Sequence, residues 1–173
     1  MNLPGSSGCE PVRLPVSADP HAPGDQDSVR AARDRYLAAN GLDTASYAAP
    51  RFALALGRLR VMLPNPGLLP YHDLHHVVTG FRSDPIGEAE ISVFELRGGG
   101  ANGMVTGLCV AGILYGLVLA PRRIVRAWRR CASTRSLYGA AVPYEVLLAM
   151  TVGELRAALG IPPDGLGEQV REV

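Results

Sequence analysis

Cysteine is scarce in this sequence, and the few copies form no recognisable framework. Cys9, Cys109 and Cys131 are odd in number, lie far apart and include no CxxC pair. Neither a disulfide-stabilised secreted domain nor a cysteine-based zinc module is therefore indicated, and a reducing compartment is expected.

A large excess of one charge is also missing. The 17 arginine and lysine residues nearly balance the 16 aspartate and glutamate residues, which leaves a net charge of +1. Such a balance gives no domain-wide basic surface, so nucleic-acid binding is not expected. The 173 residues, of which 47% are hydrophobic, suit one compact domain.

The start of the chain lacks a targeting pattern. Residues 1–27 hold five prolines with scattered glycine, serine and aspartate, and they include neither an apolar stretch of signal-peptide length nor an arginine-rich amphipathic pattern. We predict a disordered leader over residues 1–27 and a helical domain over residues 28–173. The expected location is cytoplasmic, with peripheral contact with the inner face of the membrane as an open alternative.

The one long apolar run falls short of a membrane span. MVTGLCVAGILYGLVLA, Met104–Ala120, has 17 residues, whereas a transmembrane helix needs roughly 20. A buried central helix is favoured, and a membrane contact is an alternative. Small residues at Gly107, Ala111 and Gly112 suit either close helix packing or a groove for an isoprenoid tail.

The rest of the pattern is helical. Asp27 or Ser28 can cap a first helix that ends at Asn40-Gly41, and Thr44 is expected to open a second one. Near the C-terminus, TVGE has the T-x-x-E pattern of a capping box and GIPP that of a helix end. No pair of strands is indicated, so we predict an all-α fold. The apolar residues assigned to the second helix are Phe52, Leu54, Leu56 and Leu59.

Potential metal ligands are concentrated in the run HDLHHVVTGFRSDPIGE, residues 72–88. Because an α-helix turns about 100° per residue, His72, Asp73 and His76 share one face. After eleven intervening residues, Glu88 completes a set of two imidazoles and two carboxylates, which are typical ligands of a divalent cation. His75 projects to another side and is at most a neighbour of the ligands.

Helix signals place these ligands on two neighbouring helices. Pro70 suits the first turn of the helix that carries the histidines, and Gly80 suits its end. Asp84 and Pro85 are typical of the start of the next helix, which would bring Glu88 back toward the histidines. We therefore predict a metal site between two adjacent helices.

Two other interpretations of the motif are weaker. An isolated HDxxH can lie on a solvated helical face, where an aspartate and a histidine form a hydrogen bond. A metal-dependent phosphohydrolase of the HD type would need a histidine upstream of the doublet and an aspartate downstream. The upstream histidine, His21, lies in the predicted leader.

The motif and its surroundings resemble the coenzyme Q (ubiquinone) biosynthesis protein 4 family, in its bacterial branch. That family's hallmark is HDxxH, eleven residues, then E, and HVVTGFRSDPIGEAEISVFEL, His76–Leu96, is similar to it throughout. VPYEVLLAMTVGELRAALGIPP resembles the family's ending, and the likeness extends over residues 44–163. It departs at Tyr144, where tryptophan is usual, and at Gly98–Gly100, where a longer polar connection is usual.

The resemblance implies a metal-dependent enzyme, a lyase or oxidoreductase, for the aromatic head group of a quinone-type or related precursor. A ring carboxyl would be replaced by a hydroxyl, with His72, Asp73, His76 and Glu88 as ligands of one divalent metal. Because this reaction needs an oxidant, iron, manganese or cobalt suits it better than zinc. The ligand types themselves do not distinguish these metals.

Four further residues are candidates to hold or surround the ligands. Glu95 lies seven residues after Glu88, on the same helical face. Tyr144 and Glu145, in the ending that resembles the family's, and His75 have a similar status. An ordinary structural or exposed role explains each of them as well.

A cluster of arginines follows the apolar run in PRRIVRAWRR. It suits either a solvated helical face or a patch for phospholipid head groups or a prenyl diphosphate. The expected partners are a hydrophobic or aromatic small molecule, a membrane surface, and a second copy or a biosynthetic complex. Family members also resemble non-catalytic scaffolds or lipid-presenting proteins, in which the metal would be structural. The five arginines are Arg122, Arg123, Arg126, Arg129 and Arg130.

Overall fold

The computed structural model describes residues 23–49, 51–56, 59–64, 67–140 and 142–167. This part of the chain is mostly helical. Its α-helices are α1 (Val29–Ala39), α2 (Leu69–Thr79), α3 (Pro85–Arg97), α4 (Gly103–Leu119), α5 (Pro121–Arg130), α6 (Tyr144–Ala149) and α7 (Val152–Leu159). The 3-10 helices η1 (Thr44–Ala48) and η2 (Leu137–Gly139) and the strands β1 (Arg51–Leu56) and β2 (Leu59–Pro64) complete the elements.

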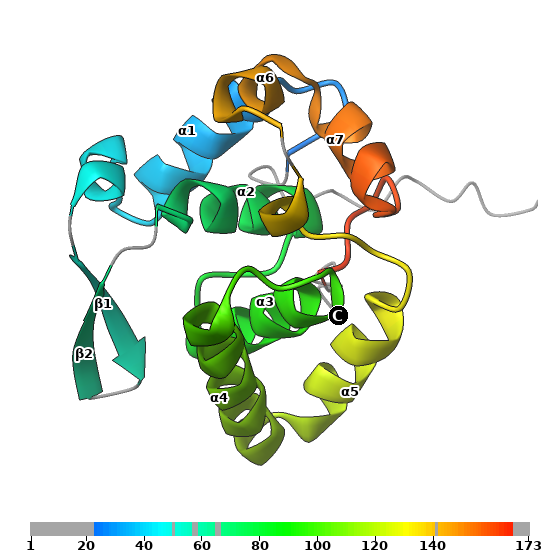
Figure 1. Ribbon diagram of the computed structural model, residues 1–173. Helices are drawn as coiled ribbons and strands as arrows, with labels where there is room; N and C mark the ends of the chain where they lie inside the picture. The colour runs from blue at the N-terminus through cyan, green and yellow to red at the C-terminus, as the bar shows by residue number, and fades with distance from the viewer. Residues whose placement is uncertain (1–22, 50, 57–58, 65–66, 141, 168–173) are drawn as a thin grey trace, which may run out of the picture.

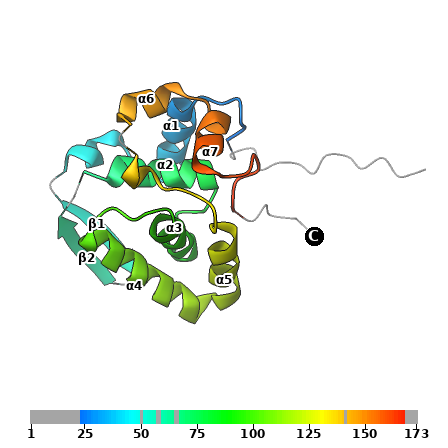
Figure 2. The same cartoon turned by 45° about the vertical axis from the view of Figure 1, so that its right-hand side comes forward.

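The helices form two groups that meet where α2 leads into α3 (Figures 1 and 2). In one group α1 packs on α2, α6 on α1, and α7 on both α1 and α2; in the other, α4 and α5 pack on α3 and on each other. One hydrophobic core runs through both groups, with Leu74 of α2, Phe94 of α3, Ile124 of α5 and Leu155 of α7 fully buried. The α2–α3 pair therefore lies at the centre of the fold.

Most of the predicted helix ends are confirmed. Ser28 caps α1 by accepting a hydrogen bond from the Ala31 N–H, and Asp84 caps α3 by accepting from Ile86 and Gly87. α2 ends at Gly80, whose φ of 73° lies in the left-handed region that glycine adopts without strain. The capping box predicted from TVGE is present at the start of α7.

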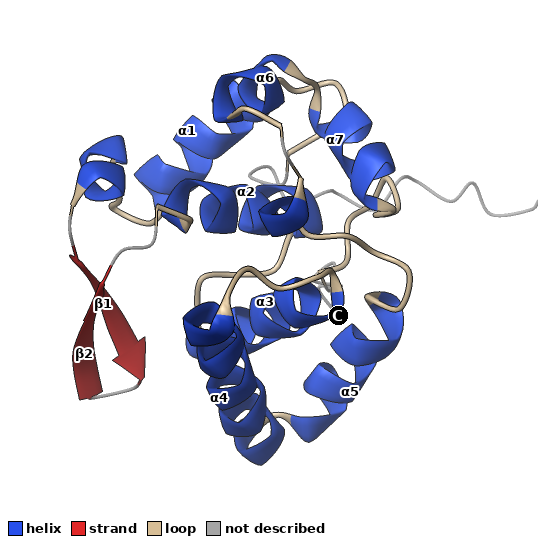
Figure 3. Ribbon diagram, in the orientation of Figure 1, coloured by secondary structure: helices blue, strands red, loops and turns tan. Residues whose placement is uncertain are grey.

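A strand hairpin is the main departure from the predicted all-α fold (Figure 3). Thr44 opens only the short η1, and the second predicted helix is wrong, because β1 and β2 pair antiparallel from Arg51 with Pro64 to Leu56 with Leu59. The physical reason lies in the spacing of the apolar residues. Large apolar residues recur at every second position, at Phe52, Leu54 and Leu56 and again at Leu59, Val61 and Leu63, which is the period of a strand rather than of a helix.

The expected buried central helix is only partly confirmed. α4 packs one narrow face, with Gly116 against Ala89 of α3 and Ile124 of α5. Its opposite face is open to solvent, and Leu114 and Val118 are 59% and 81% exposed. Among the described residues, no helix is both long and apolar enough to cross a membrane.

The domain begins earlier than residue 28. Val152 and Gly153 donate backbone hydrogen bonds to the carbonyls of Asp27 and Asp25, and the buried Arg156 donates to the Asp25 carboxylate over 2.9 Å. Residues 23–27 are therefore part of the fold rather than of a leader. Residues 1–22, which carry the rest of that prediction and His21, lie outside the described residues.

Candidate metal centre

The turn between α2 and α3 sets the position of the candidate ligands. The Thr79 hydroxyl donates to the His75 carbonyl and accepts from the Phe81 N–H, which ties the end of α2 to the turn. At the start of α3, a Cβ on Gly87 would lie 1.9 Å from the Arg82 carbonyl oxygen, so only glycine permits this close approach. The next residue, Glu88, consequently faces α2.

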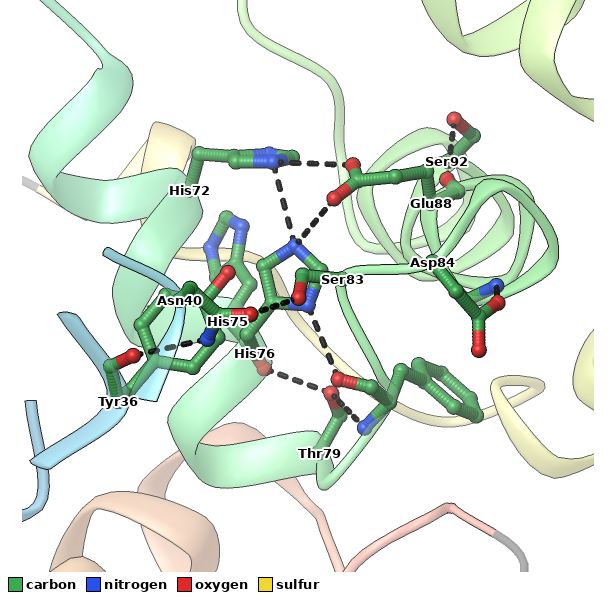
Figure 4. Close-up of polar contacts among 12 residues, drawn as sticks. Tyr36, Asn40, His72, His75, His76, Thr79, Ser83, Asp84, Glu88 and Ser92 are labelled. Atoms are coloured by element: carbon green, nitrogen blue, oxygen red, sulfur yellow. Dashed lines mark hydrogen bonds and ion pairs between the residues drawn. The ribbon is translucent and has the colours of Figure 1, made fainter. Parts of the chain in front are cut away.

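Three potential ligand atoms converge between α2 and α3 (Figure 4). The Nε2 atoms of His72 and His76 lie 3.3 Å apart, and the two carboxylate oxygens of Glu88 lie 3.3 Å from these two nitrogens, one from each. All three residues offer a ligand atom within 4.8 Å of the others. Around a metal with bonds of about 2.0–2.1 Å, tetrahedral ligand atoms are roughly 3.3–3.4 Å apart. Each of these three contacts has the spacing of two ligand atoms on one metal, and the three residues together could hold a metal ion.

The second ring nitrogen of each histidine is anchored by the protein. Nδ1 of His76 lies 3.0 Å from the Phe81 carbonyl oxygen, which can only accept, so this nitrogen carries the hydrogen. Nδ1 of His72 lies 2.8 Å from Oε1 of Glu95 and donates to that carboxylate. In their neutral forms both imidazoles therefore turn the lone pair of Nε2 toward Glu88, as metal-binding histidines do.

Glu95 is the centre of the polar network beneath the cluster. Its Oε1 accepts hydrogen bonds of 2.8 Å from His72 and His75 and of 2.7 Å from the Tyr138 hydroxyl, while Oε2 lies 3.5 Å from Sγ of Cys109. Burial by itself would raise the pKa of Glu95, but the charge of His72 and the histidine hydrogen bonds hold this pKa well below its usual range. Glu95, which the sequence suggests as a support for the ligands, thus contacts one of them, His72, directly.

His75 reaches the cluster only through Glu95. It is fully buried, its Nε2 accepts a 3.0 Å hydrogen bond from the Leu137 N–H, and its Nδ1 therefore donates to Glu95. Burial lowers the pKa of His75 and keeps the ring neutral. This histidine neighbours the candidate ligands and lies outside the group of three that could hold a metal ion.

The electrostatics of the cluster favour a positive charge at its centre. Burial opposes protonation of His72, yet the carboxylates of Glu95 and Glu88 raise its pKa well above the ordinary value. Burial would raise the pKa of Glu88, but the charge of His76 and the hydrogen bonds from both histidines lower it overall. The His76 side chain is fully buried, whereas those of His72 and Glu88 are 24% and 39% exposed. One side of the cluster is consequently accessible from solvent.

Asp73, the fourth predicted ligand, is not part of this group. Its side chain is buried, and its Oδ2 accepts a 2.8 Å hydrogen bond from the Tyr47 hydroxyl. Burial raises the pKa of Asp73, while Tyr47 and the charges of the two histidines lower it. Asp73 therefore borders the cluster with its carboxylate turned to Tyr47, and its role as a metal ligand stays a prediction.

Two other predicted neighbours lie further away. Tyr144 packs edge-on against Tyr47 and Tyr71, with ring centroids 6.3 and 5.6 Å apart, so it approaches the cluster only by way of Tyr47. The side chain of Glu145 is 75% exposed and forms an ion pair of 2.7 Å with Arg30. The suggestion that Glu145 supports the ligands is therefore wrong, because adjacent residues of α6 point in different directions.

The five arginines of α5 do not form one patch. Arg123 is paired with the buried Glu90, and Arg130 donates to the Leu166 carbonyl over 2.6 Å. The other three are exposed and line a shallow surface groove of about 440 Å³ together with Pro121 and Val125. None of the candidate metal ligands lines this groove. The three groove arginines are Arg122, Arg126 and Arg129.

Three residues at the cluster were not predicted from the sequence. The ring of Tyr36, on α1, stacks on His76 with a centroid distance of 5.2 Å and an angle of 17° between the planes. Tyr138 and Cys109 contact Glu95 from η2 and α4. All three come from distant parts of the chain, so no local pattern around the HDxxH motif could have identified them.

Comparisons with models of protein families, with curated proteins and with solved structures find no match. The likeness to the coenzyme Q biosynthesis protein 4 family thus remains a prediction from the motif and its flanking residues.

Proposed function

We propose that the protein is a metal-dependent enzyme that acts on the aromatic head group of a quinone-type or related biosynthetic precursor. The metal would be held by His72, His76 and Glu88, with Asp73 as a further candidate ligand. The reaction would be an oxidative decarboxylation, in which a ring carboxyl is exchanged for a hydroxyl.

The observation that carries the proposal is the close approach of the Nε2 atoms of His72 and His76 to each other and to the Glu88 carboxylate. When both histidines are neutral they donate through Nδ1, so the Nε2 atoms that carry the lone pairs lie 3.3 Å from each other, and each lies 3.3 Å from one oxygen of the Glu88 carboxylate. Such an arrangement is unfavourable unless a cation lies between the groups. A divalent ion satisfies all three groups at once, whereas protonation of His72, whose pKa the carboxylates of Glu95 and Glu88 raise, satisfies only its contact with Glu88.

The chemistry needs an oxidant, for which we take dioxygen. Overall, ArCO2H + O2 + H2O would give ArOH + CO2 + H2O2, so the ring carbon loses carbon dioxide, gains a hydroxyl, and two electrons pass to dioxygen. The metal, when bound, would supply a site for the substrate's carboxylate or phenolate and a route for these electrons. The chain's own contribution is to fix the two imidazoles through Glu95 and the Phe81 carbonyl, and to leave one side of the cluster accessible.

The exposure of Glu88 favours this proposal over a scaffold with a structural metal. Structural zinc sites are closed by four protein ligands, whereas catalytic sites keep a position for water or substrate. Here three donors converge, the fourth candidate is engaged with Tyr47, and the Glu88 side chain is 39% exposed. A scaffold or lipid-presenting role is the second candidate function that the sequence suggests.

Incubation with a prenylated 4-hydroxybenzoate under oxygen tests the proposal. Protein loaded separately with iron, manganese, cobalt or zinc is assayed for carbon dioxide and for the hydroxylated product by mass spectrometry. We expect equal amounts of both products with a redox-active metal. The Glu88→Ala variant should be inactive, and Glu145→Ala, which removes an exposed carboxylate away from the cluster, should retain activity.

Zinc bound at one ion per chain without turnover of any carboxylated hydroxyaromatic would instead favour the scaffold. In that case zinc removal should unfold the protein rather than only inactivate it.

A further inference from the structure

The outer face of α4 is apolar along its whole length. On a helical wheel its exposed positions fall on one side, opposite to the buried Cys109 and Ile113. Leu114 and Val118 are 59% and 81% exposed, and no charged or strongly polar residue interrupts the face. An uncovered apolar face of this kind marks a contact surface. Its members are Met104, Gly107, Val110, Ala111, Leu114, Leu117 and Val118.

The apolar face continues onto α5, where it meets the groove arginines. Val125 and Trp128 are 44% and 43% exposed, and Trp128 is also covered on one side by the guanidinium of Arg97, 4.7 Å from its ring centroid. The groove lined by Arg122, Arg126 and Arg129 lies on the same helix. Figure 2 shows α4 and α5 together along one edge of the molecule, away from α1, α6 and α7.

Charge is strongly segregated along the chain. The segment from Leu96 to Tyr144, which contains α4 and α5, has seven arginines and no aspartate or glutamate. The rest of the sequence has ten arginines and sixteen acidic residues, so its net charge has the opposite sign. The balanced total of +1 therefore conceals a basic segment that carries the exposed apolar face.

We propose that the outer face of α4 and α5 docks on an anionic lipid membrane. The apolar residues of α4, with Val125 and Trp128, would enter the boundary between head groups and acyl chains, and Arg122, Arg126 and Arg129 would bind lipid phosphates. Apolar residues and tryptophan beside arginines have the composition of a helix that lies in the membrane interface.

A second copy of the chain suits the face less well. In a symmetric dimer the same surface of each subunit is buried, so two acid-free, arginine-rich segments would be brought together. Like charges at such short range disfavour the contact. A nucleic acid would pair with the arginines but would leave the apolar face of α4 in water.

The sole tryptophan provides a direct reporter, because Trp128 lies on the proposed face. Its fluorescence is measured with vesicles of phosphatidylcholine alone and of phosphatidylcholine mixed with phosphatidylglycerol, and binding is confirmed by co-sedimentation. We expect a blue shift and binding with the anionic vesicles, quenching by lipids brominated on the acyl chains, and weaker binding as salt is added.

Paired variants separate the two parts of the face. Leu114→Glu with Val118→Glu, and Arg122→Glu with Arg129→Glu, should each weaken binding by about tenfold or more. The matched controls are Leu42→Glu with Val146→Glu, which are 45% and 52% exposed, and the surface pair Arg30→Glu with Arg35→Glu. Both controls should bind as the wild type does. All substituted positions are exposed, so the variants are expected to fold.

Three outcomes would overturn the proposal: no binding of the wild type to anionic vesicles, equal binding by the face variants and the controls, or a wild-type dimer that Leu114→Glu with Val118→Glu dissociates while vesicles are not bound. The last result would assign the face to a second copy. No metal ligand is involved, so this inference stands independently of the proposed enzymatic function.

Discussion

At the scale of single residues, the arrangement around Glu95 determines what His72 can do. A neutral imidazole offers one lone pair, and the hydrogen bond from Nδ1 of His72 to Glu95 directs that lone pair, on Nε2, toward the cluster. The same carboxylate also accepts from His75 and Tyr138, so its position is fixed from three sides. Glu95 is therefore a positioning residue for the metal centre.

Replacement of Glu95 by glutamine should weaken metal binding while leaving all proposed ligands in place. The amide keeps the size of the side chain but removes the charge and part of the hydrogen-bond acceptance, and loss of such a partner typically costs about 10–100-fold in metal affinity. Affinity is measured by competition with a chromophoric chelator. Because Glu95 is buried, we also expect destabilisation of about 1–3 kcal/mol.

Two further variants show whether the loss is specific. Glu145→Gln changes an exposed carboxylate and should bind metal as the wild type does. Tyr138→Phe removes one donor to Glu95 and should lower the affinity less than Glu95→Gln. Unchanged affinity in folded Glu95→Gln would contradict the positioning role.

The candidate ligands were predictable because their spacing is local. His72 and His76 are four residues apart on one helix, and Glu88 follows a turn with clear end and start signals at Gly80 and Asp84. The contact between Asp73 and Tyr47 was not predictable, since Tyr47 lies 26 residues earlier in the chain. Contacts of that kind depend on the packing of separate elements.

At the scale of secondary structure elements, Gly116 and Gly107 show which side of α4 packs against its neighbours and which side is open. A Cβ on Gly116 would lie 2.6 Å from Cβ of Ala89 and 2.7 Å from Cδ1 of Ile124, so α3, α4 and α5 meet closely there. A Cβ on Gly107 would meet no neighbouring atom within 4 Å. Close packing thus explains Gly116, and Gly107 lies on the exposed apolar face.

Alanine substitution at these two positions should have opposite effects. Gly116→Ala overpacks the three-helix junction and should destabilise the fold by about 1–3 kcal/mol. Gly107→Ala adds a methyl group to open space and improves helix propensity, so it should stabilise the fold by up to about 1 kcal/mol. Urea unfolding of both variants tests whether α4 is closely packed at Gly116 and open at Gly107. Equal destabilisation by the two substitutions would contradict this difference.

The cap of α7 should make a pH-dependent contribution to stability. Hydrogen bonds from the Thr151 N–H and hydroxyl lower the pKa of Glu154. Because the folded pKa is below the unfolded value of about 4.3, this stabilisation is complete above the unfolded pKa and is lost as the pH falls through the folded pKa. Glu154→Ala should therefore destabilise the protein at neutral pH and have a smaller effect in acid.

Urea unfolding of Glu154→Ala and wild type at neutral pH and at about pH 3 checks this prediction. A difference in the free energy of unfolding that is the same at both pH values would show that the charge of Glu154 contributes nothing to the capping box.

Capping residues were the most reliable guide to the elements, and the hairpin was the main error. Ser28, Asp84 and Thr151 each satisfy backbone donors that a helix start leaves unpaired, so their effect is local. The large apolar residues of segments 51–56 and 59–64 recur at every second position, and a helical period was assigned to them wrongly. The burial of α4 was overestimated because hydropathy alone does not indicate whether other elements cover a helix.

At the scale of the whole molecule, the candidate metal centre joins the two groups of helices. Its histidines belong to α2, which packs with α1 and α7, and its carboxylate belongs to α3, which packs with α4 and α5. A cation bound at this place would link both groups. Because such a ligand binds the folded state and finds no assembled site in the unfolded chain, it should stabilise the entire fold.

Metal addition should therefore raise the melting temperature. At a free metal concentration one hundred times the Kd, the stabilisation is about 2.7 kcal/mol, which corresponds to a shift on the order of 5–10 °C for a domain of this size. Differential scanning calorimetry with and without metal measures it. Glu88→Ala should show almost no shift, whereas a shift of wild-type size in this variant would place the ion elsewhere.

The metal content of the purified protein tests the central claim most directly. Wild type, Glu88→Ala, His76→Ala and the control Glu145→Ala are purified without added metal, checked for folding by circular dichroism, and subjected to elemental analysis. We expect close to one divalent ion per chain in wild type and Glu145→Ala, and a large loss in the two folded ligand variants. A folded wild type without metal that also fails to bind iron, manganese, cobalt or zinc, or full occupancy in both ligand variants, would contradict a metal centre formed by His72, His76 and Glu88.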